Sequence, residues 1–449
     1  MALAMEPAAE HRDRLQPPRA TVTALVMAVM APLCFTPPGR GHAPGWGGTH
    51  YIAPPPRVHE GRMQFASHPP LGIMLIAAGD MASGLNENTD WQAIGAPRAI
   101  PAEAMPPGFD YRGPRLASAL FGVIGAGLFC LLMIRLTGSA VAGGMLSLLF
   151  LADTALLVQL RSAQLDSFQI AFVLAALLAA LSAWRSGRVR YFALFGLFVA
   201  CAALVRANGL VTGIIGLGLL WPALQRREWV LLLRQACAGA GGGLAALALT
   251  FAAFYALSPL PPDPATPVGQ DNARFLSPHH AAALSGGGRD LMAMAQGLAD
   301  YQRYMANDLA ITPRADANSS HPAQWLLGRG TILYRADRRP GHQEAIGLVP
   351  NLAAWLVSLL GVLTSLIPSR LRGNPVRAAL LAAWIANMAV LQYLDGVRVL
   401  YLYHYFIPLL LGHAMAACEW RQHGLPRLPA AIIAALVFVT GASTLSYAT

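Results

Sequence analysis

Apolar segments recur along most of the chain, and each is close to the length that a membrane-spanning helix requires. A helix needs about 20 apolar residues to cross the hydrocarbon core of a bilayer. Only 12% of the 449 residues are charged, whereas soluble domains carry about a quarter. The sequence therefore predicts an all-α, polytopic membrane protein with about eleven transmembrane helices and disfavours a water-soluble enzyme. The expected spans are 20–36, 114–136, 140–158, 163–184, 190–205, 207–223, 229–256, 350–368, 376–394, 399–418 and 428–446.

Two long polar segments interrupt the apolar ones and are too long to be simple connectors. We expect both to fold as loop regions outside the membrane. The second lacks the strand repeats that an inserted β-trefoil domain needs. The predicted parts are a tail with the first span (1–36), a loop region (37–113), a bundle (114–256), a second loop region (257–349) and a C-terminal bundle (350–449).

Arginine is distributed unequally between the two sets of short loops. The richer set holds Arg12, Arg14, Arg19, Arg135, Arg185, Arg188, Arg190, Arg226, Arg227, Arg234, Arg370, Arg372, Arg377, Arg421 and Arg427. Positive residues accumulate on the cytoplasmic side. We therefore expect a bacterial inner-membrane protein with a cytoplasmic N-terminus, and with both long loops and the C-terminus outside. This placement explains the net charge of +10 without a nucleic-acid partner.

The opposite short loops hold only Arg161, Arg206 and Arg398, each at or within the end of a span. A charge at membrane depth is costly, so it extends to the interface, pairs with another group, or faces a polar cavity. Three arginines beside large outer loops favour a cavity that binds an anion such as a phosphate head group. Arginine suits phosphate because its planar guanidinium donates two parallel hydrogen bonds.

Several stretches resemble, in order, the protein O-mannosyltransferase family, whose members use dolichyl- or polyprenyl-phosphate-linked mannose. They are "SHPPLGIMLIAAGD", "RGPRLASALFGVIGAGL", "LLFLADTALLVQLRSAQLDSFQIAF", "NSSHPAQWLLGRGTILY" and "RVLYLYHYFIPLLL". The resemblance implies the C-type glycosyltransferase membrane fold, with a cavity that opens sideways to lipid.

The resemblance also implies site residues. His68 of the HPPLG segment borders the family's active cavity, although a plain interfacial turn accounts for the same prolines. Arg206 and Arg398 are the preferred phosphate ligands. Arg161 either pairs with Asp166, five residues on, or reaches the lipid phosphate while Asp166 orients neighbouring backbone.

Two aromatic stretches add candidates for binding the donor. Tyr403 and His404 lie among four amphipathic side chains in "YLYHYFIP", where they bind the sugar or phosphate or form an interfacial aromatic belt. His321 belongs to "SSHPAQW", which lacks the family's aromatic residue after the proline and its fuller tryptophan cluster.

The family pattern breaks where the catalytic base is expected. Aligning His50 and Tyr51 with the family places its Asp-Glu pair at Gly47 and Gly48, and glycine cannot accept a proton. Glu60 is the carboxylate in this loop that could replace it, unless it is only a solvated charge beside neighbouring arginines. The carboxylates further along the chain are Asp80, Asp90 and Asp110.

Two hypotheses follow. The chain either transfers a hexose such as mannose from a polyprenyl phosphate to a protein or other acceptor on the outer face, or is a catalytically silent relative. The silent relative would be a subunit or lipid-binding scaffold of a membrane complex. For the transferase we expect membrane lipid, the lipid-linked sugar and the acceptor as partners, with no cofactor, no metal site and no nucleic acid.

Overall fold

The computed structural model describes most of the chain. The described residues are 17–35, 60–89, 105–106, 108–287, 290–311, 316–339, 342–372, 374–423 and 427–448.

Each predicted apolar segment coincides with a helix or a run of helices, which confirms the all-α fold. They are α2 (Arg19–Phe35), α6 (Arg112–Thr137), α7 to α9 (Ala140–Leu146, Leu148–Leu151, Thr154–Leu160), α10 (Asp166–Ser186), α11 (Val189–Val205), η2 with α12 (Ala207–Ile214, Ile215–Gln225), α13 (Trp229–Leu257), α18 (Leu352–Ser365), α20 (Pro375–Asp395), η4 with α21 (Leu402–Tyr405, Phe406–His423) and α22 (Arg427–Ala448).

Not every one of these helices is long enough to cross a bilayer alone. Among the described residues, five pass a test of length and hydropathy: Arg112–Thr137, Asp166–Ser186, Ala207–Gln225, Trp229–Leu257 and Pro375–Asp395. A sixth results if the helices over 140–160 form one span despite their 71° bend. A multi-pass membrane protein is therefore confirmed, whereas about eleven spans stays a prediction.

The third predicted span, over 140–158, is bent where α9 begins. The helix restarts at Asp153, whose carboxylate accepts a hydrogen bond from the Leu156 amide at 3.2 Å. Trp355 of α18 donates to the other carboxylate oxygen at 2.6 Å. Such capping satisfies backbone donors that a new helix leaves exposed. It also fixes α9 against α18, and α9 carries Arg161 at its C-terminal end.

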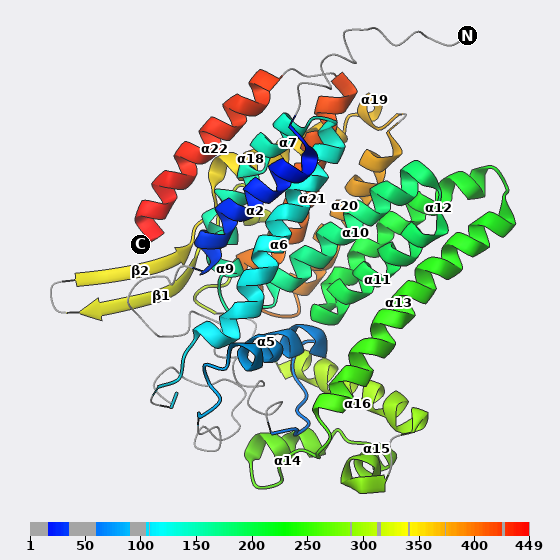
Figure 1. Cartoon of the computed structure of the whole chain (residues 1–449), viewed down its shortest axis with the longest axis vertical. Coiled ribbons are helices and arrows are strands. Elements are labelled where there is room, and N and C mark those ends of the chain that lie inside the picture. Colours follow the sequence, from blue (N-terminus) through cyan, green and yellow to red (C-terminus); the bar gives the residue numbers. More distant parts are fainter. Residues whose placement is uncertain are drawn as a thin grey trace.

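The helices of the two long polar segments are α5 (Pro70–Ser83), α14 (Pro267–Ala273), α15 (Pro278–Ala282), α16 (Leu291–Ile311) and α17 (Pro322–Trp325), with the π-helical turn η3 (Ala283–Gly287) after α15. The helices of these segments that Figure 1 labels, α5, α14, α15 and α16, lie at the same end of the bundle. The short α19 (Pro368–Leu371) lies at the opposite end. Pro70 starts α5 at the first helical position, where its missing N–H costs nothing.

A β-hairpin, which the sequence analysis did not predict, lies within the second polar segment. Strands β1 (Ile332–Arg339) and β2 (His342–Leu348) pair antiparallel, with Ile332 opposite Leu348 and an irregularity between Leu333 and Arg335. Ile332, Tyr334 and Leu348 are buried in the main core, so the base of the hairpin is anchored there. The rest of the hairpin projects from the bundle beside α22 (Figure 1).

Aromatic side chains join the first loop region to the helices beneath it. The Phe65 ring lies 5.4 Å from the Tyr301 ring of α16, which itself lies 5.5 Å from the Phe254 ring of α13. All three side chains are buried. Edge-to-face packing of this kind adds to the free energy gained from burial. The segment between Glu60 and His68 is therefore held against α13 and α16.

Candidate functional site

A buried ion pair lies at the centre of the candidate site. Asp166, the first residue of α10, accepts a hydrogen bond from Arg206 Nη1 at 2.9 Å, and the two side chains are 3% and 5% exposed. Gln159 Nε2 donates to the other oxygen of Asp166 at 2.7 Å. Arg206 interrupts the helical path by adopting an extended conformation after α11. The structure thus pairs Asp166 with Arg206 rather than with Arg161.

One face of α10 also holds the backbone around Arg206. Gln169 lies three residues after Asp166, so both side chains project from the same helix face. Its Nε2 donates to the Arg206 carbonyl oxygen at 3.1 Å and to Asn208 Oδ1 at 2.8 Å. The guanidinium and the peptide of Arg206 are therefore both fixed by the first turns of α10.

An aromatic stack covers the other side of Arg206. Its guanidinium carbon lies 5.0 Å from the centre of the Tyr403 ring, within the range of a cation–π contact. The Tyr403 ring is stacked on His404 at 4.6 Å and on Tyr401 at 5.6 Å. Arg398, like Arg206, lies within electrostatic range of His404. The structure brings four candidates from distant parts of the chain into one cluster: Arg206, Arg398, Tyr403 and His404.

The HPPLG helix packs against the residues that neighbour this ion pair in the chain. Ile73 and Ile76 of α5 share a buried apolar cluster with Leu165, Phe168 and Val205, which flank Asp166 and Arg206 in the chain. The glycine of HPPLG permits the close approach, since a Cβ at position 72 would lie only 2.7 Å from Leu165 Cδ2.

His68, which precedes the two prolines, is placed through its backbone. The Tyr301 hydroxyl donates to the His68 carbonyl oxygen at 2.9 Å. Burial raises the pKa of Tyr301, so the hydroxyl keeps the proton that it donates. The His68 side chain is half-buried.

Arg161 belongs to a neighbouring cationic group at the end of α9. Arg115 of α6 and Tyr334 of β1 both lie within electrostatic range of it. Tyr334 also lies within range of Asp166, so this group adjoins the ion pair. Burial raises the pKa of Tyr334 to about 12, and the phenol therefore remains neutral beside the two arginines.

His321 lies at the start of α17, next to the segment that carries Arg398. Its Nδ1 is 3.0 Å from both carboxylate oxygens of Asp395 at the end of α20. The amide of Ser320 donates to the Leu400 carbonyl oxygen at 3.1 Å. These two contacts attach the SHPAQW stretch to residues 395–400, although the His321 side chain itself is 71% exposed.

Glu60 is the first residue of the first loop region that the structure describes, and it is half-buried. The following residues bind the chain after α13: the Leu260 amide donates to the Gly61 carbonyl oxygen at 2.8 Å, and the Met63 amide donates to the Leu260 carbonyl oxygen at 2.9 Å. Positions 47 to 51, where the family's acidic pair would fall, lie outside the described residues.

The alternative carboxylates hold local structure together. Asp80, 2% exposed, accepts a hydrogen bond from Asn86 Nδ2 at 2.7 Å. Asp110 accepts a hydrogen bond at 2.9 Å from Nε of Arg112, which lies at the start of α6. Asp90 lies outside the described residues. The role of Glu60 as the base stays a prediction.

The arrangement offers guanidinium groups for an anion and aromatic rings for a sugar, which is the chemistry that a sugar phosphate requires. Sequence reasoning missed three contributors: Phe65, Tyr301 and Tyr334. Tyr334 stands in a stretch that already resembled the family, so its position beside a candidate arginine was the available signal. Phe65 and Tyr301 gave no signal, because their contact joins segments more than two hundred residues apart.

A comparison with known protein families matches the part of the chain that contains much of this cluster. A family model described as dolichyl-phosphate-mannose-protein mannosyltransferase matches residues 46–258, which include HPPLG, Arg161, Asp166 and Arg206. The chain resembles the protein O-mannosyltransferases. The resemblance predicted from the motifs is thereby confirmed, although a comparison with curated proteins found no match.

Solved structures give the fold. The protein O-mannosyltransferase Pmt1-Pmt2 complex of S. cerevisiae, bound to the sugar donor, matches with a TM-score of 0.77 at 12% identity, over 97% of this chain and 90% of that one. The oligosaccharyltransferase of Archaeoglobus fulgidus matches with a TM-score of 0.51 at 13% identity, over 96% of this chain and 56% of that one. The fold is that of the C-type membrane glycosyltransferases, as predicted.

Proposed function

We propose that the protein transfers a hexose, such as mannose, from a polyprenyl phosphate to an acceptor hydroxyl on the outer face of the membrane. The observation that carries the proposal is the cluster in which Arg206 contacts the Tyr403–His404 stack and Arg398 lies within electrostatic range of it. Arg398 is half-buried and binds the donor phosphate. Arg206, buried and paired, orients the aromatic rings and adds its positive charge to the cavity.

The fold supports the proposal because a neighbour of the same architecture, the S. cerevisiae complex, is bound to its sugar donor. The direct test supplies the purified full-length protein with a polyprenyl phosphate carrying radiolabelled mannose. Release of polyprenyl phosphate together with labelled acceptor supports the transferase. Retention of the intact donor, with no turnover in the presence of total membrane protein as acceptor, contradicts it.

A second candidate is a silent relative that binds the lipid donor within a membrane complex. The replacement of the expected acidic pair by Gly47 and Gly48 favours it. The S. cerevisiae neighbour is itself a complex, Pmt1-Pmt2. A scaffold would bind the donor and a partner protein without transferring sugar.

Arg398→Ala is expected to weaken binding of the polyprenyl-phosphate sugar by about 1.5–3 kcal/mol, the usual contribution of a hydrogen bond to a charged group. The affinity is measured on purified protein with a fluorescent donor analogue. Arg274→Ala is the matched control, since this arginine at the same end of the bundle is 77% exposed. Equal affinities in both variants would assign Arg398 to the membrane interface.

The proposed orientation predicts which end of the bundle a membrane-impermeant thiol reagent reaches in intact cells. Leu291→Cys on α16 should react, because position 291 is 82% exposed and belongs to the outer loop region. Ser186→Cys, at the exposed end of α10, should react only after lysis. The background carries Cys237→Ser, which removes an exposed natural thiol. The reverse labelling pattern would show that the protein has the opposite orientation in the membrane.

A further inference from the structure

His321 and Asp395 form a hydrogen-bonded pair at the end of the bundle that carries the candidate site. Nδ1 of His321 lies 3.0 Å from both carboxylate oxygens of Asp395. An ionised carboxylate only accepts hydrogen bonds, so Nδ1 carries a proton in this contact. The neutral imidazole then keeps a lone pair on Nε2, where it can accept a second proton. A histidine whose tautomer is set by a carboxylate is suited to act as a general base.

Several contacts hold the backbone around His321 in place. Its amide donates to Gln324 Oε1 at 3.0 Å, and the amide of Ser320 donates to the Leu400 carbonyl oxygen at 3.1 Å. Trp325, which is fully buried, donates from Nε1 to Ser320 Oγ at 2.8 Å. The imidazole therefore projects from a fixed frame, and 71% of the side chain is exposed to a substrate that arrives from solution.

The pair is attached to the turn that carries Arg398. The two contacts of the SHPAQW stretch with this turn, at Asp395 and at Leu400, lie on either side of Arg398 in the chain. Arg398 lies within electrostatic range of His404, so the turn also adjoins the aromatic stack. In the proposed function Arg398 binds the donor phosphate, and the anomeric carbon of the sugar is joined to that phosphate through one oxygen. The exposed imidazole of His321 is thus attached to the same turn as the group that binds the phosphate.

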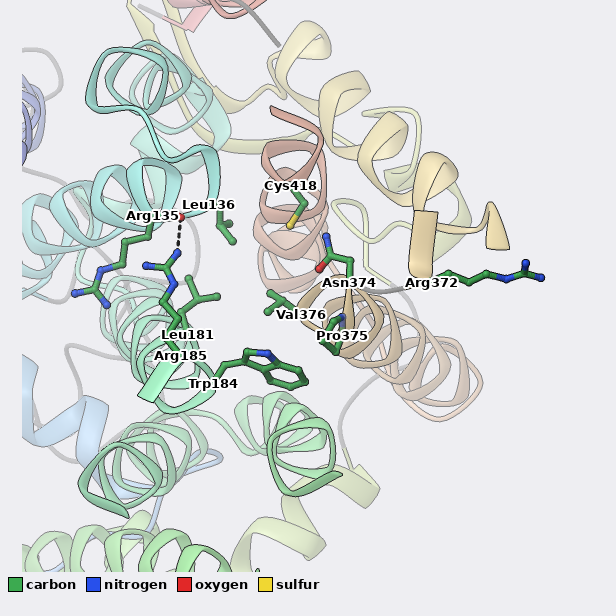
Figure 2. Close-up of a pocket in the computed structure, with 10 residues that line it drawn as sticks. All are labelled: Arg135, Leu136, Leu181, Trp184, Arg185, Arg372, Asn374, Pro375, Val376 and Cys418. Carbon is green, nitrogen blue, oxygen red and sulfur yellow. Dashed lines mark hydrogen bonds between the residues drawn. The ribbon is translucent and has the colours of Figure 1, made fainter. Parts of the chain in front are cut away.

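The cavity at the opposite end of the bundle provides no group of this kind. It has a volume of about 560 Å³ and lies beside the last turns of α6 and α10. No histidine or carboxylate is among the ten described residues that line it. Figure 2 shows Trp184 and Asn374 near its centre, while the side chains of Arg135 and Arg372 point outward at opposite margins. This cavity therefore contributes no general base.

A general base is required because an attacking hydroxyl must lose its proton, and Gly47 and Gly48 stand where the family's acidic pair would. We propose that His321 is this base and that Asp395 is its positioning residue. The inference rests on the proposed function, and it assigns to His321 the role that the sequence suggested for Glu60.

In the proposed step, the acceptor oxygen forms a bond to the anomeric carbon of the sugar while the bond from that carbon to the phosphate oxygen breaks. The electron pair of the broken bond leaves with polyprenyl phosphate. The hydroxyl proton passes to Nε2 of His321, and the imidazolium releases it to water before the next turnover. The carboxylate of Asp395 stabilises the imidazolium through Nδ1.

The test measures release of polyprenyl phosphate by the purified full-length protein, from a polyprenyl phosphate carrying radiolabelled mannose, with total membrane protein as acceptor. H321A is expected to lower the rate by about 10² to 10⁴, the usual contribution of a positioned base. Affinity for a fluorescent donor analogue should stay at the wild-type level. Imidazole added to H321A should restore part of the rate, because position 321 is exposed. Pyrazole, which has the same shape but is a far weaker base, should not.

Two further variants separate proton transfer from anchoring of the SHPAQW stretch. D395N keeps a polar group beside Nδ1 but no longer fixes the tautomer, so it should lower the rate and leave donor affinity unchanged. H321N keeps a donor toward Asp395 but has no basic nitrogen, so it should be as slow as H321A and serves in its place if H321A does not fold. The matched control is H279A, because His279 is another exposed histidine of the same loop region and its Nε2 lies 3.0 Å from Asp290. H279A should transfer at the wild-type rate.

Wild-type rates in H321A or H321N would overturn the inference, as would a loss in H279A equal to that in H321A. Equal recovery with pyrazole and imidazole, or none with imidazole, would show that His321 only anchors the loop. Turnover that is lost in Glu60→Gln but kept in H321A would leave the proposed function standing and return the role of base to Glu60. A wild-type protein without turnover would contradict the proposed function itself, and the inference with it.

Discussion

Replacing Arg206 with alanine is expected to destabilise the folded protein by about 3–5 kcal/mol, more than the loss of a donor contact alone would cost. The change leaves the Asp166 carboxylate buried without its ionic partner, and an uncompensated buried charge carries a penalty of about this size. It also removes the contact with the Tyr403 ring. The loss is measured as the shift of the unfolding transition in detergent, followed by tryptophan fluorescence.

A double-mutant cycle separates the ion pair from the rest of the site. Asp166→Leu alone leaves a buried guanidinium and should destabilise by a similar amount. The double variant Asp166→Leu with Arg206→Met should recover much of the loss, because it removes both charges and keeps apolar volume. Arg398→Ala is the control and should leave the unfolding transition near that of wild type. An Arg206→Ala protein as stable as wild type would show that the pair adds little to the fold.

The three outer arginines are expected to have different roles. Arg206 is 5% exposed and bound on both faces, by Asp166 and by Tyr403. We expect Arg206 to contribute mainly by holding the surrounding elements together, whereas Arg398 and Arg161 are only half-buried. Loss of donor binding in an Arg206 variant is therefore interpretable only alongside its stability.

The fold was predictable because membrane helices are defined by apolar length, a local property of the sequence. Span boundaries were less predictable where the helix is interrupted. The segment over 140–158 breaks at Asp153, and the predicted span from 207 begins with a 3₁₀ turn. Side chains from other helices contact both interruptions: Trp355 donates a hydrogen bond to Asp153, and Gln169 donates one to Asn208.

The partners within the site could not be read from spacing. Asp166 lies five residues from Arg161 and forty from Arg206, yet it bonds the distant arginine. The packing of α10 against α11 decides this, because it brings the first turn of one helix beside the last turn of the other. The hairpin was missed for a related reason. Ile332, Tyr334 and Leu348 are buried at its base, but so few apolar positions are not enough to indicate strands.

Glu60→Gln is expected to reduce sugar transfer by about 10² to 10⁴ if Glu60 is the general base, while donor affinity stays unchanged. Glutamine keeps the shape of the side chain but does not accept the proton of the attacking hydroxyl, and a positioned base contributes about this factor. Donor affinity should persist because, in the proposed function, the phosphate is held at Arg398, on another segment. The rate is measured as release of polyprenyl phosphate from the labelled donor, with Glu87→Gln, an exposed carboxylate near the end of α5, as the control.

The same assay on Gly47→Asp with Gly48→Glu decides what Glu60 replaces. These substitutions restore the acidic pair at the positions aligned with the family. If Glu60 has taken over as base, the restored pair should rescue turnover in the Glu60→Gln background, because the phosphate and sugar contacts remain intact. If wild type is inactive and the restored pair creates turnover, the cavity is complete and only the base was lost, which makes the natural chain a donor-binding scaffold. Wild-type turnover that is indifferent to Glu60→Gln would remove Glu60 from the mechanism and direct attention to Asp90, since Asp80 is already bound to Asn86 and Asp110 to Arg112.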